Sequence, residues 1–177
     1  MSTASLFFGQ QIVRRILPHR FSMLLLDRVE SYIPAKRTII GCKQVSLSDP
    51  LVQGYLPACP AFPPVLVIEA LAQLCGFMMN LEYLSRSGID LAQLGWPGYR
   101  QGALPAIPHS VLADSKILQH SLVEPGLTLR LAATVALQRN DIYIFKAQAS
   151  VEADEVASGD IMLAYPAYTS HAAQPVA

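Results

Sequence analysis

Residues 54 to 73 read Gly54-Tyr55-Leu56-Pro57-Ala58-Cys59-Pro60-Ala61-Phe62-Pro63-Pro64-Val65-Leu66-Val67-Ile68-Glu69-Ala70-Leu71-Ala72-Gln73. The prolines at 57, 60, 63 and 64 keep the first part of this stretch out of a helix. Pro64 itself suits a first helical turn, where an amide hydrogen would have no partner. The run that follows is apolar on nearly every side, which predicts a long buried helix from about residue 64 to 86.

Glu69 is the only ionisable side chain between Phe62 and Leu74. A buried carboxylate is costly, so it either finds hydrogen-bond partners or takes up a proton. In a wet pocket, such a carboxyl can serve as a general acid or base. The alternative is structural: Glu69 accepts hydrogen bonds from backbone amides and braces the preceding loop.

The rest of the sequence predicts one short helix and a set of strands. The helix is expected at residues 10 to 16, and the strands are expected at 23–32, 37–45, 111–118, 128–139, 142–151 and 155–165. Asn140-Asp141 suits a tight hairpin turn between two of these strands. We therefore expect one α+β domain over residues 1–168, followed by a disordered tail at 169–177.

Residues 89 to 110 interrupt this pattern with Trp96-Pro97-Gly98-Tyr99 and further glycine and proline residues. Aromatic residues among prolines and glycines suit a packed lid. A plain surface connection is the alternative. The segment is therefore expected to be a divergent insertion or a lid.

The composition is apolar for a chain of this length. Of the 177 residues, 52% are hydrophobic and 15% are charged, with a formal net charge of zero. Average usage is about 25% charged, so part of the surface is expected to be covered by a second subunit. No basic stripe favours nucleic acid, and residues 61–79, interrupted by Pro63, Pro64, Glu69 and Gln73, are expected to form a core helix and not a membrane span.

The three cysteines and four histidines are scattered along the sequence, at 42, 59 and 75 and at 19, 109, 120 and 171. No pair of them has a metal-ligand or disulfide spacing, so we expect neither a metal nor a disulfide framework. The first ten residues lack the pattern of a secretory signal, and a cytoplasmic location is expected. No organic cofactor is expected.

Three segments resemble the β-hydroxyacyl-acyl-carrier-protein dehydratases of type II fatty acid synthesis. They are Ile16-Leu17-Pro18-His19-Arg20-Phe21-Ser22-Met23-Leu24-Leu25-Leu26-Asp27-Arg28-Val29, the stretch 53–73, and the weaker pair Ala113-Asp114-Ser115-Lys116 and Val123-Glu124-Pro125-Gly126. The resemblance covers most of residues 12 to 166. It implies the hot-dog fold, in which a curled antiparallel sheet wraps a long central helix and two subunits pair.

The departures from the family pattern concern the catalytic loop. The family's catalytic pair is a histidine and the helix glutamate, and a glycine amide polarises the thioester carbonyl. Glu69 stands at its family position, but Tyr55 replaces the histidine, Cys59 a second histidine, and Pro64 the glycine. A phenol has an ordinary pKa of about 10 against about 6.5 for imidazole. Proline has no N–H to donate. Together these changes suggest a damaged or replaced mechanism.

The candidate site residues follow from this comparison. Glu69 and Tyr55 are the candidate catalytic residues, although Tyr55 could also simply fill the volume of the missing imidazole. Cys59 has no basic neighbour in sequence, so we expect a small buried hydrophobe and not a nucleophile. The residues expected to contact substrate are Pro64, Val65, Cys59, Phe62 and His19, of which His19 is equally suited to a structural role.

Three functions remain open at this stage. The favoured one is an acyl-thioester-binding, dehydratase-like subunit that is catalytically impaired or serves as the non-catalytic partner of an active homologue. The second is an active dehydratase in fatty acid or polyketide-type synthesis that uses Glu69 with a substitute base. The third is an acyl thioesterase, which rests on fold analogy. All three imply an acyl carrier protein or coenzyme A thioester, and a homodimer or heterodimer.

Overall fold

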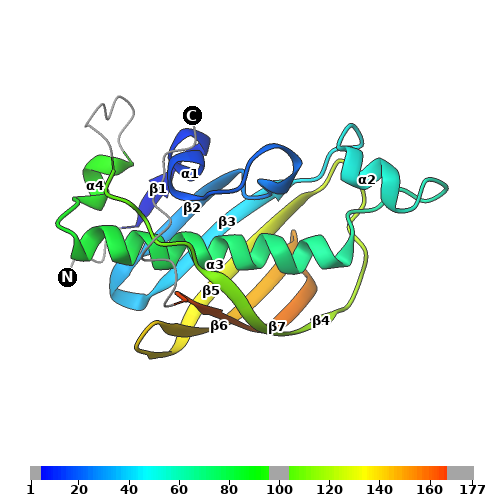
Figure 1. Cartoon of the computed structure of the whole chain (residues 1–177). Helices are drawn as coiled ribbons and strands as arrows, with labels where there is room; N and C mark the ends of the chain where they lie inside the picture. Colours follow the sequence, from blue (N-terminus) through cyan, green and yellow to red (C-terminus); the bar gives the residue numbers. More distant parts are fainter. Residues whose placement is uncertain (1–4, 96–103, 167–177) are drawn as a thin grey trace.

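The computed structural model describes residues 5–95 and 104–166, in which one seven-stranded antiparallel sheet curls around helix α3, Pro64–Arg86 (Figure 1). The strand order is β1-β2-β3-β5-β6-β7-β4. The strands are β1 Leu6–Phe8, β2 Arg28–Ile33, β3 Thr38–Gln44, β4 Val111–Gln119, β5 Thr128–Arg139, β6 Ile142–Val151 and β7 Asp154–Ala164. The α+β hot-dog arrangement predicted from the sequence is confirmed.

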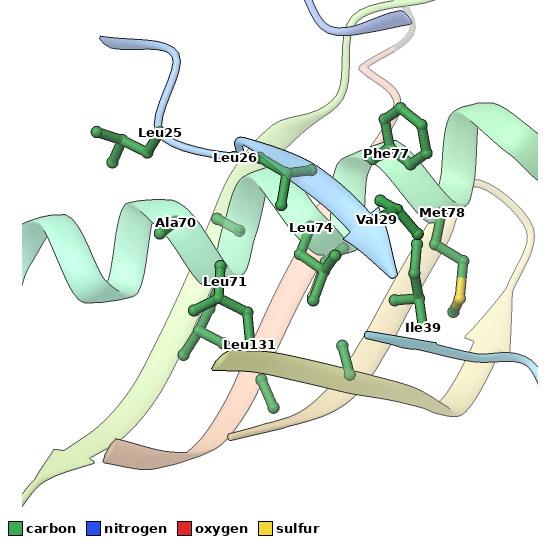
Figure 2. Packing of buried hydrophobic residues seen from close by; sticks show 14 of the residues in the cluster. Leu25, Leu26, Val29, Ile39, Ala70, Leu71, Leu74, Phe77, Met78 and Leu131 are labelled. Carbon is green, nitrogen blue, oxygen red and sulfur yellow. The ribbon is translucent and has the colours of Figure 1, made fainter. Parts of the chain in front are cut away.

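Helix α3 begins at Pro64, as its sequence predicts, and ends at Arg86. Its Leu71, Leu74 and Met78 side chains point into the curved sheet and pack near Ile39 and Leu131 (Figure 2). Burying one such aliphatic side chain stabilises the fold by about 1.5–3 kcal/mol. By length and hydropathy α3 could also cross a membrane, but 72% of its most apolar window is buried inside the protein. It is therefore the core helix of the domain.

The strand predicted from Met23 begins later, at Arg28. Residues Phe21–Met23 form a 3-10 turn instead, and Phe21 has a left-handed φ of 54°. The strand begins late because the amides of Leu25 and Leu26 donate to the Gln73 side chain of α3 and not to a neighbouring strand. The predicted start of this strand at Met23 is therefore wrong.

Three short elements were not predicted from the sequence. They are strand β1, helix α2 (Pro50–Tyr55) and helix α4 (Leu91–Leu94). Both helices begin after an aspartate, Asp49 or Asp90, whose side chain accepts a hydrogen bond from the backbone two residues later. An aspartate immediately before a helix is a signal for a helix start, but both helices are too short for the sequence to show a helical pattern after it. Short helix α1, Gln10–Ile16, was predicted correctly.

The sheet has two edges, β1 and β4. Strand β4 is reached by a segment that crosses over α3 (Figure 1), and its outer edge has no partner strand within the described part of the chain. Its Leu112 and Leu118 side chains are 44% and 70% exposed. A long edge strand with exposed apolar side chains is a surface on which a second chain can pair.

Candidate functional site

Glu69, Gln73 and Asn80 form a polar stripe along the apolar part of α3, and Gly76 lies on the same face. Their spacing of four, three and four residues places them on one face of the helix. This face lies under the loop that joins α1 to β2 and under the segment that leads into β4. The stripe is the base of the candidate site.

Gln73 is fully buried and uses all four of its hydrogen-bonding positions. Its Oε1 accepts from the amides of Leu25 and Leu26 at 2.9 and 3.3 Å. Its Nε2 donates to the Met23 carbonyl at 2.6 Å and to Oε1 of Glu69 at 2.8 Å. One amide therefore holds the loop against α3 and orients the carboxylate.

Asn80 performs the same task two turns further along α3. Its Nδ2 donates to the Ile16 carbonyl at 3.3 Å, and its Oδ1 accepts from the hydroxyl of Tyr165 at 3.0 Å. The loop that follows α1 is thus fixed to the helix at both ends. His19 lies between these two anchors in the sequence.

His19 contacts Glu69. Its Nε2 atom is 3.5 Å from Oε1 of Glu69, and the two side chains are 32% and 26% exposed. The other ring nitrogen, Nδ1, is buried and has no hydrogen-bond partner among the described residues. A buried polar atom of this kind is ordinarily satisfied by water or by a bound group.

The surroundings of His19 favour its neutral form. Burial lowers the pKa of His19 below its ordinary 6.5, the negative charge of Glu69 opposes this, and Arg20 and His109 add to the lowering. A neutral imidazole can accept a proton at neutral pH. The pair therefore combines a base with a carboxyl group at nearly hydrogen-bonding distance, and it can exchange a proton with a bound molecule.

A cavity of about 90 Å³ contains this pair, and we call it the Glu69 cavity. Its polar lining consists of His19, Glu69, Gln73, Asn80, His109 and Ser110. Its apolar lining includes Leu17, Pro18 and, from the edge strand β4, Leu112. Small-molecule sites usually measure about 300–1,000 Å³, so the cavity of one chain is too small for a whole acyl thioester.

Gly76 lets the segment before β4 approach α3 closely. A Cβ atom at this position would lie 3.1 Å from the Ser110 hydroxyl oxygen. The absence of a side chain at Gly76 thus brings Ser110, and with it His109, against the polar stripe. The last residues of the segment 89–110 therefore line the site. Residues 96–103 of this segment lie outside the described part of the chain.

The other residues singled out from the sequence lie away from the Glu69 cavity. Tyr55 ends α2 and is 40% exposed, and Val65 is 67% exposed in the first turn of α3. Cys59 is exposed, so the expectation of a buried hydrophobe is wrong. Phe62 is fully buried in the core, where its amide bonds to the Val123 carbonyl. Pro64 occupies the first position of α3.

Sequence reasoning missed three members of the site: Gln73 as the anchor, Asn80 and His109. The first two had a signal, because polar residues at positions 69, 73 and 80 share one helical face within an apolar run. His109 had none, since nothing in its sequence neighbourhood connects it to residue 19. Within residues 5–95 and 104–166, no group of three potential ligands could hold a metal ion.

Comparisons with known proteins agree on one family. Residues 17–95 match the family described as FabA-like domain. The chain is 37% identical over 153 residues to the 3-hydroxyacyl-[acyl-carrier-protein] dehydratase FabZ of Zymomonas mobilis, covering 85% of each chain. It is 34% identical over 153 residues to FabZ of Xanthomonas oryzae pv. oryzae, covering 86% of this chain and 88% of the other.

A solved structure supports the same fold. A chain of the dehydratase heterocomplex ApeI:P from Xenorhabdus doucetiae superposes with a TM-score of 0.68 at 19% sequence identity. The superposition covers 89% of this chain and 92% of the other. At this identity the likeness speaks for the hot-dog fold alone.

Proposed function

The chain belongs to the FabA-like family of hot-dog dehydratases, and we propose from this premise that it dehydrates 3-hydroxyacyl thioesters with Glu69 as acid and His19 as base. The observation that carries the proposal is the 3.5 Å contact between the two side chains inside one cavity. The family's own base position holds Tyr55, which is not part of that cavity. His19 is thus a substitute base.

The reaction needs two proton movements. The imidazole of His19 takes the α-proton of the substrate, and the electron pair of that C–H bond forms the new double bond. The β C–O bond breaks as the Glu69 carboxyl gives its proton to the departing hydroxyl, which leaves as water. The imidazolium then returns a proton to the Glu69 carboxylate across 3.5 Å, which restores the pair.

Pro64 limits the rate that we expect. It stands where family members carry a glycine whose amide polarises the thioester carbonyl, and it has no N–H to donate. Losing one such donor typically costs about 10²–10³ in rate. The proposed enzyme is therefore slower than its relatives unless another donor reaches the carbonyl.

A second subunit completes the proposed site. The Glu69 cavity measures about 90 Å³ in one chain, which is too small for an acyl chain. Leu112 joins its wall to the exposed edge of β4, the surface on which another chain can pair. We therefore propose a dimer with the acyl tunnel at the seam. The partner is either a second copy of this chain or an unlike homologue.

The second candidate function is a non-catalytic partner subunit. Its supporting observation is that Tyr55 lies exposed at the end of α2, where family members carry the catalytic histidine. In this case the chain shapes the tunnel and an active homologue supplies the chemistry. The acyl-thioester ligand is common to both candidates.

One assay separates the candidates. The purified chain is incubated with 3-hydroxyacyl thioesters of acyl carrier protein and of coenzyme A, and the enoyl product and the free thiol are measured. For the proposed enzyme, enoyl product forms, and Glu69→Gln and His19→Asn each lower its rate by about 10²–10⁴. Glu124→Gln, which changes an exposed carboxylate in a turn, is the matched control.

The other outcomes are equally informative. Product formation only after an active homologue is added favours the non-catalytic subunit. Free thiol without enoyl product identifies a thioesterase. Either result contradicts the Glu69–His19 mechanism.

A further inference from the structure

A second cavity lies at the carboxyl end of α3, and we call it the α3-end cavity. It has a volume of about 600 Å³ and is lined by β1, the connection from β2 to β3, the last turns of α3 and α4. Figure 1 shows α4 at the end of α3 opposite to α2. Within the described part of the chain, no residue lines both this cavity and the Glu69 cavity. Glu69 and Glu82, which line one cavity each, are separated by about 20 Å along the helix axis.

The walls of the α3-end cavity are largely apolar. They include Leu6 of β1, Pro34 after β2, and Ile89 and Leu91 around the start of α4. Small-molecule sites usually measure about 300–1,000 Å³ and combine apolar walls with a few polar groups that orient the ligand. The size and the walls of this cavity therefore suit a molecule with an apolar body.

Two charged side chains of the cavity neutralise each other. Nε and Nη2 of Arg37 donate to Oε1 and Oε2 of Glu82, each at 2.8 Å. Oε2 of Glu82 also accepts from the hydroxyl of Tyr143 at 3.4 Å. Both oxygens of this carboxylate are thus engaged within the protein. Glu82 is a structural partner of Arg37 and not the group that receives a ligand.

Tyr32 provides a hydrogen-bond donor that the fold does not use. It is 2% exposed and lines the α3-end cavity, and its hydroxyl forms no hydrogen bond with any of the described residues. Burial raises the pKa of Tyr32 above its ordinary 10, and Glu82 adds to the rise, so the hydroxyl keeps its proton at neutral pH. A buried polar group without a protein partner is ordinarily satisfied by water or by a bound group.

Arg86 provides a positive charge in the same cavity. Its Nη2 donates to the hydroxyl of Tyr143 at 3.3 Å, but it forms no ion pair with a carboxylate of the described residues. Asp90, the second carboxylate of the lining, is exposed and accepts from the amide of Ala92 at 2.9 Å. Two arginines and two carboxylates line the cavity, so their charges sum to zero. An anion is therefore selected by contact with Arg86 and Tyr32 and not by long-range attraction.

We propose that the α3-end cavity binds a monocarboxylate with an apolar tail, of the class of a medium-chain fatty acid. The carboxylate accepts hydrogen bonds from the Tyr32 hydroxyl and the Arg86 guanidinium group, both of which bind an anion more strongly than a neutral acceptor. The tail lies against the apolar walls. The proposal does not depend on dehydration at Glu69, because the two cavities share none of their described lining.

The test measures the binding of three probes to the full chain by titration calorimetry. Octanoate has both the head and the tail, octanamide has the same tail with an uncharged head, and acetate has the head without the tail. Tyr32→Phe and Arg86→Gln are the test variants. Tyr83→Phe and Arg14→Gln are the matched controls, because neither residue lines the cavity.

We expect octanoate to bind more tightly than either octanamide or acetate. Tyr32→Phe weakens its binding about tenfold, the effect of one hydrogen bond to a charged group. Arg86→Gln weakens it about three- to fivefold, the effect of one exposed ion pair. The two controls bind octanoate as the wild type does, and so does His19→Asn, which alters the Glu69 cavity.

Urea unfolding without ligand separates a binding role of Tyr32 from a structural one. Because its hydroxyl has no partner among the described residues, Tyr32→Phe should not lower the free energy of unfolding. A loss of stability in this variant would show that the hydroxyl serves the fold and would overturn the inference.

The other contrary outcomes are equally clear. No binding of octanoate, equal binding of octanoate and octanamide, or undiminished binding in Tyr32→Phe shows that the α3-end cavity is not a carboxylate site. Loss of binding in His19→Asn places octanoate in the Glu69 cavity instead. None of these results bears on dehydration at Glu69, so the proposed function stands or falls separately.

Discussion

The Nε2 atom of Gln73 donates a hydrogen bond of 2.8 Å to Oε1 of Glu69, one helical turn away. The same side chain also bonds to three backbone groups of residues 23–26. The orientation of the acid is therefore linked to the position of the loop that carries His19. Stability and activity should respond together when this amide is changed.

The first prediction concerns Gln73→Leu. The change leaves the amides of two buried residues, Leu25 and Leu26, without an acceptor, at about 1–3 kcal/mol for each group. Added apolar contact offsets part of this loss, so we expect the free energy of unfolding to fall by about 2–4 kcal/mol in urea titrations. Gln53→Leu, on the exposed face of α2, should stay within about 0.5 kcal/mol of the wild type. Equal effects of the two changes would contradict the anchoring role.

The second prediction concerns the pH dependence of activity. The pKa of His19 lies below 6.5, so the imidazole stays neutral, and able to accept a proton, as the pH falls through 6.5. The acid limb of the kcat/KM profile for dehydration should therefore lie below pH 6.5. The charged or titratable groups that act on His19 are Glu69, Arg20 and His109.

His109→Gln provides the decisive comparison for this pH profile. It removes one cause of the lowered pKa, so the acid limb should move to higher pH. His120→Gln changes an imidazole that contacts Glu155 and does not line the Glu69 cavity, so it should leave the limb unmoved. An acid limb that does not respond to His109→Gln would show that another group is the base.

The third prediction tests the close approach at Gly76. Alanine at this position favours the helix by about 0.5–1 kcal/mol, but its Cβ would lie 3.1 Å from the Ser110 hydroxyl oxygen. Gly76→Ala alone should therefore gain no stability, whereas in a Ser110→Ala background it should stabilise the protein by about 0.5–1 kcal/mol. Urea unfolding of the four proteins gives the coupling energy. Additive effects would mean that residues 76 and 110 do not touch.

The fourth prediction concerns the attachment of β4. Gly159 has a φ of 152°, and a Cβ there would lie 1.9 Å from the Lys116 carbonyl oxygen. Gly159→Ala must push β4 away from β7, and we expect a loss of more than about 3 kcal/mol or no soluble protein. Gly54→Ala, inside α2 with no atom within 4 Å of the added Cβ, should be neutral or slightly stabilising in the same urea titration. Similar stability of the two variants would disprove the steric argument.

The sequence was sufficient for the elements whose signals are local. The prolines at 63 and 64 and the apolar run after them located α3, and Asn140, with a φ of 52°, formed the expected hairpin between β5 and β6. Helices α2 and α4 were missed because six and four residues are too few for a periodic pattern.

The site was predictable only in part. Glu69 stood out because it is alone among apolar neighbours, but its contact with His19 joins residues 50 positions apart, and no spacing rule reports such a pair. The expectation that Cys59 is buried failed because its loop stays at the surface. The roles of Tyr55 and Pro64 remain predictions.

Leu112 belongs both to the edge strand β4 and to the wall of the Glu69 cavity. A second chain that pairs with β4 would then be separated from Glu69 and His19 by the Leu112 side chain. Under the proposed function, exchanging one neighbour for another would change the preferred acyl length without altering a single residue of this chain.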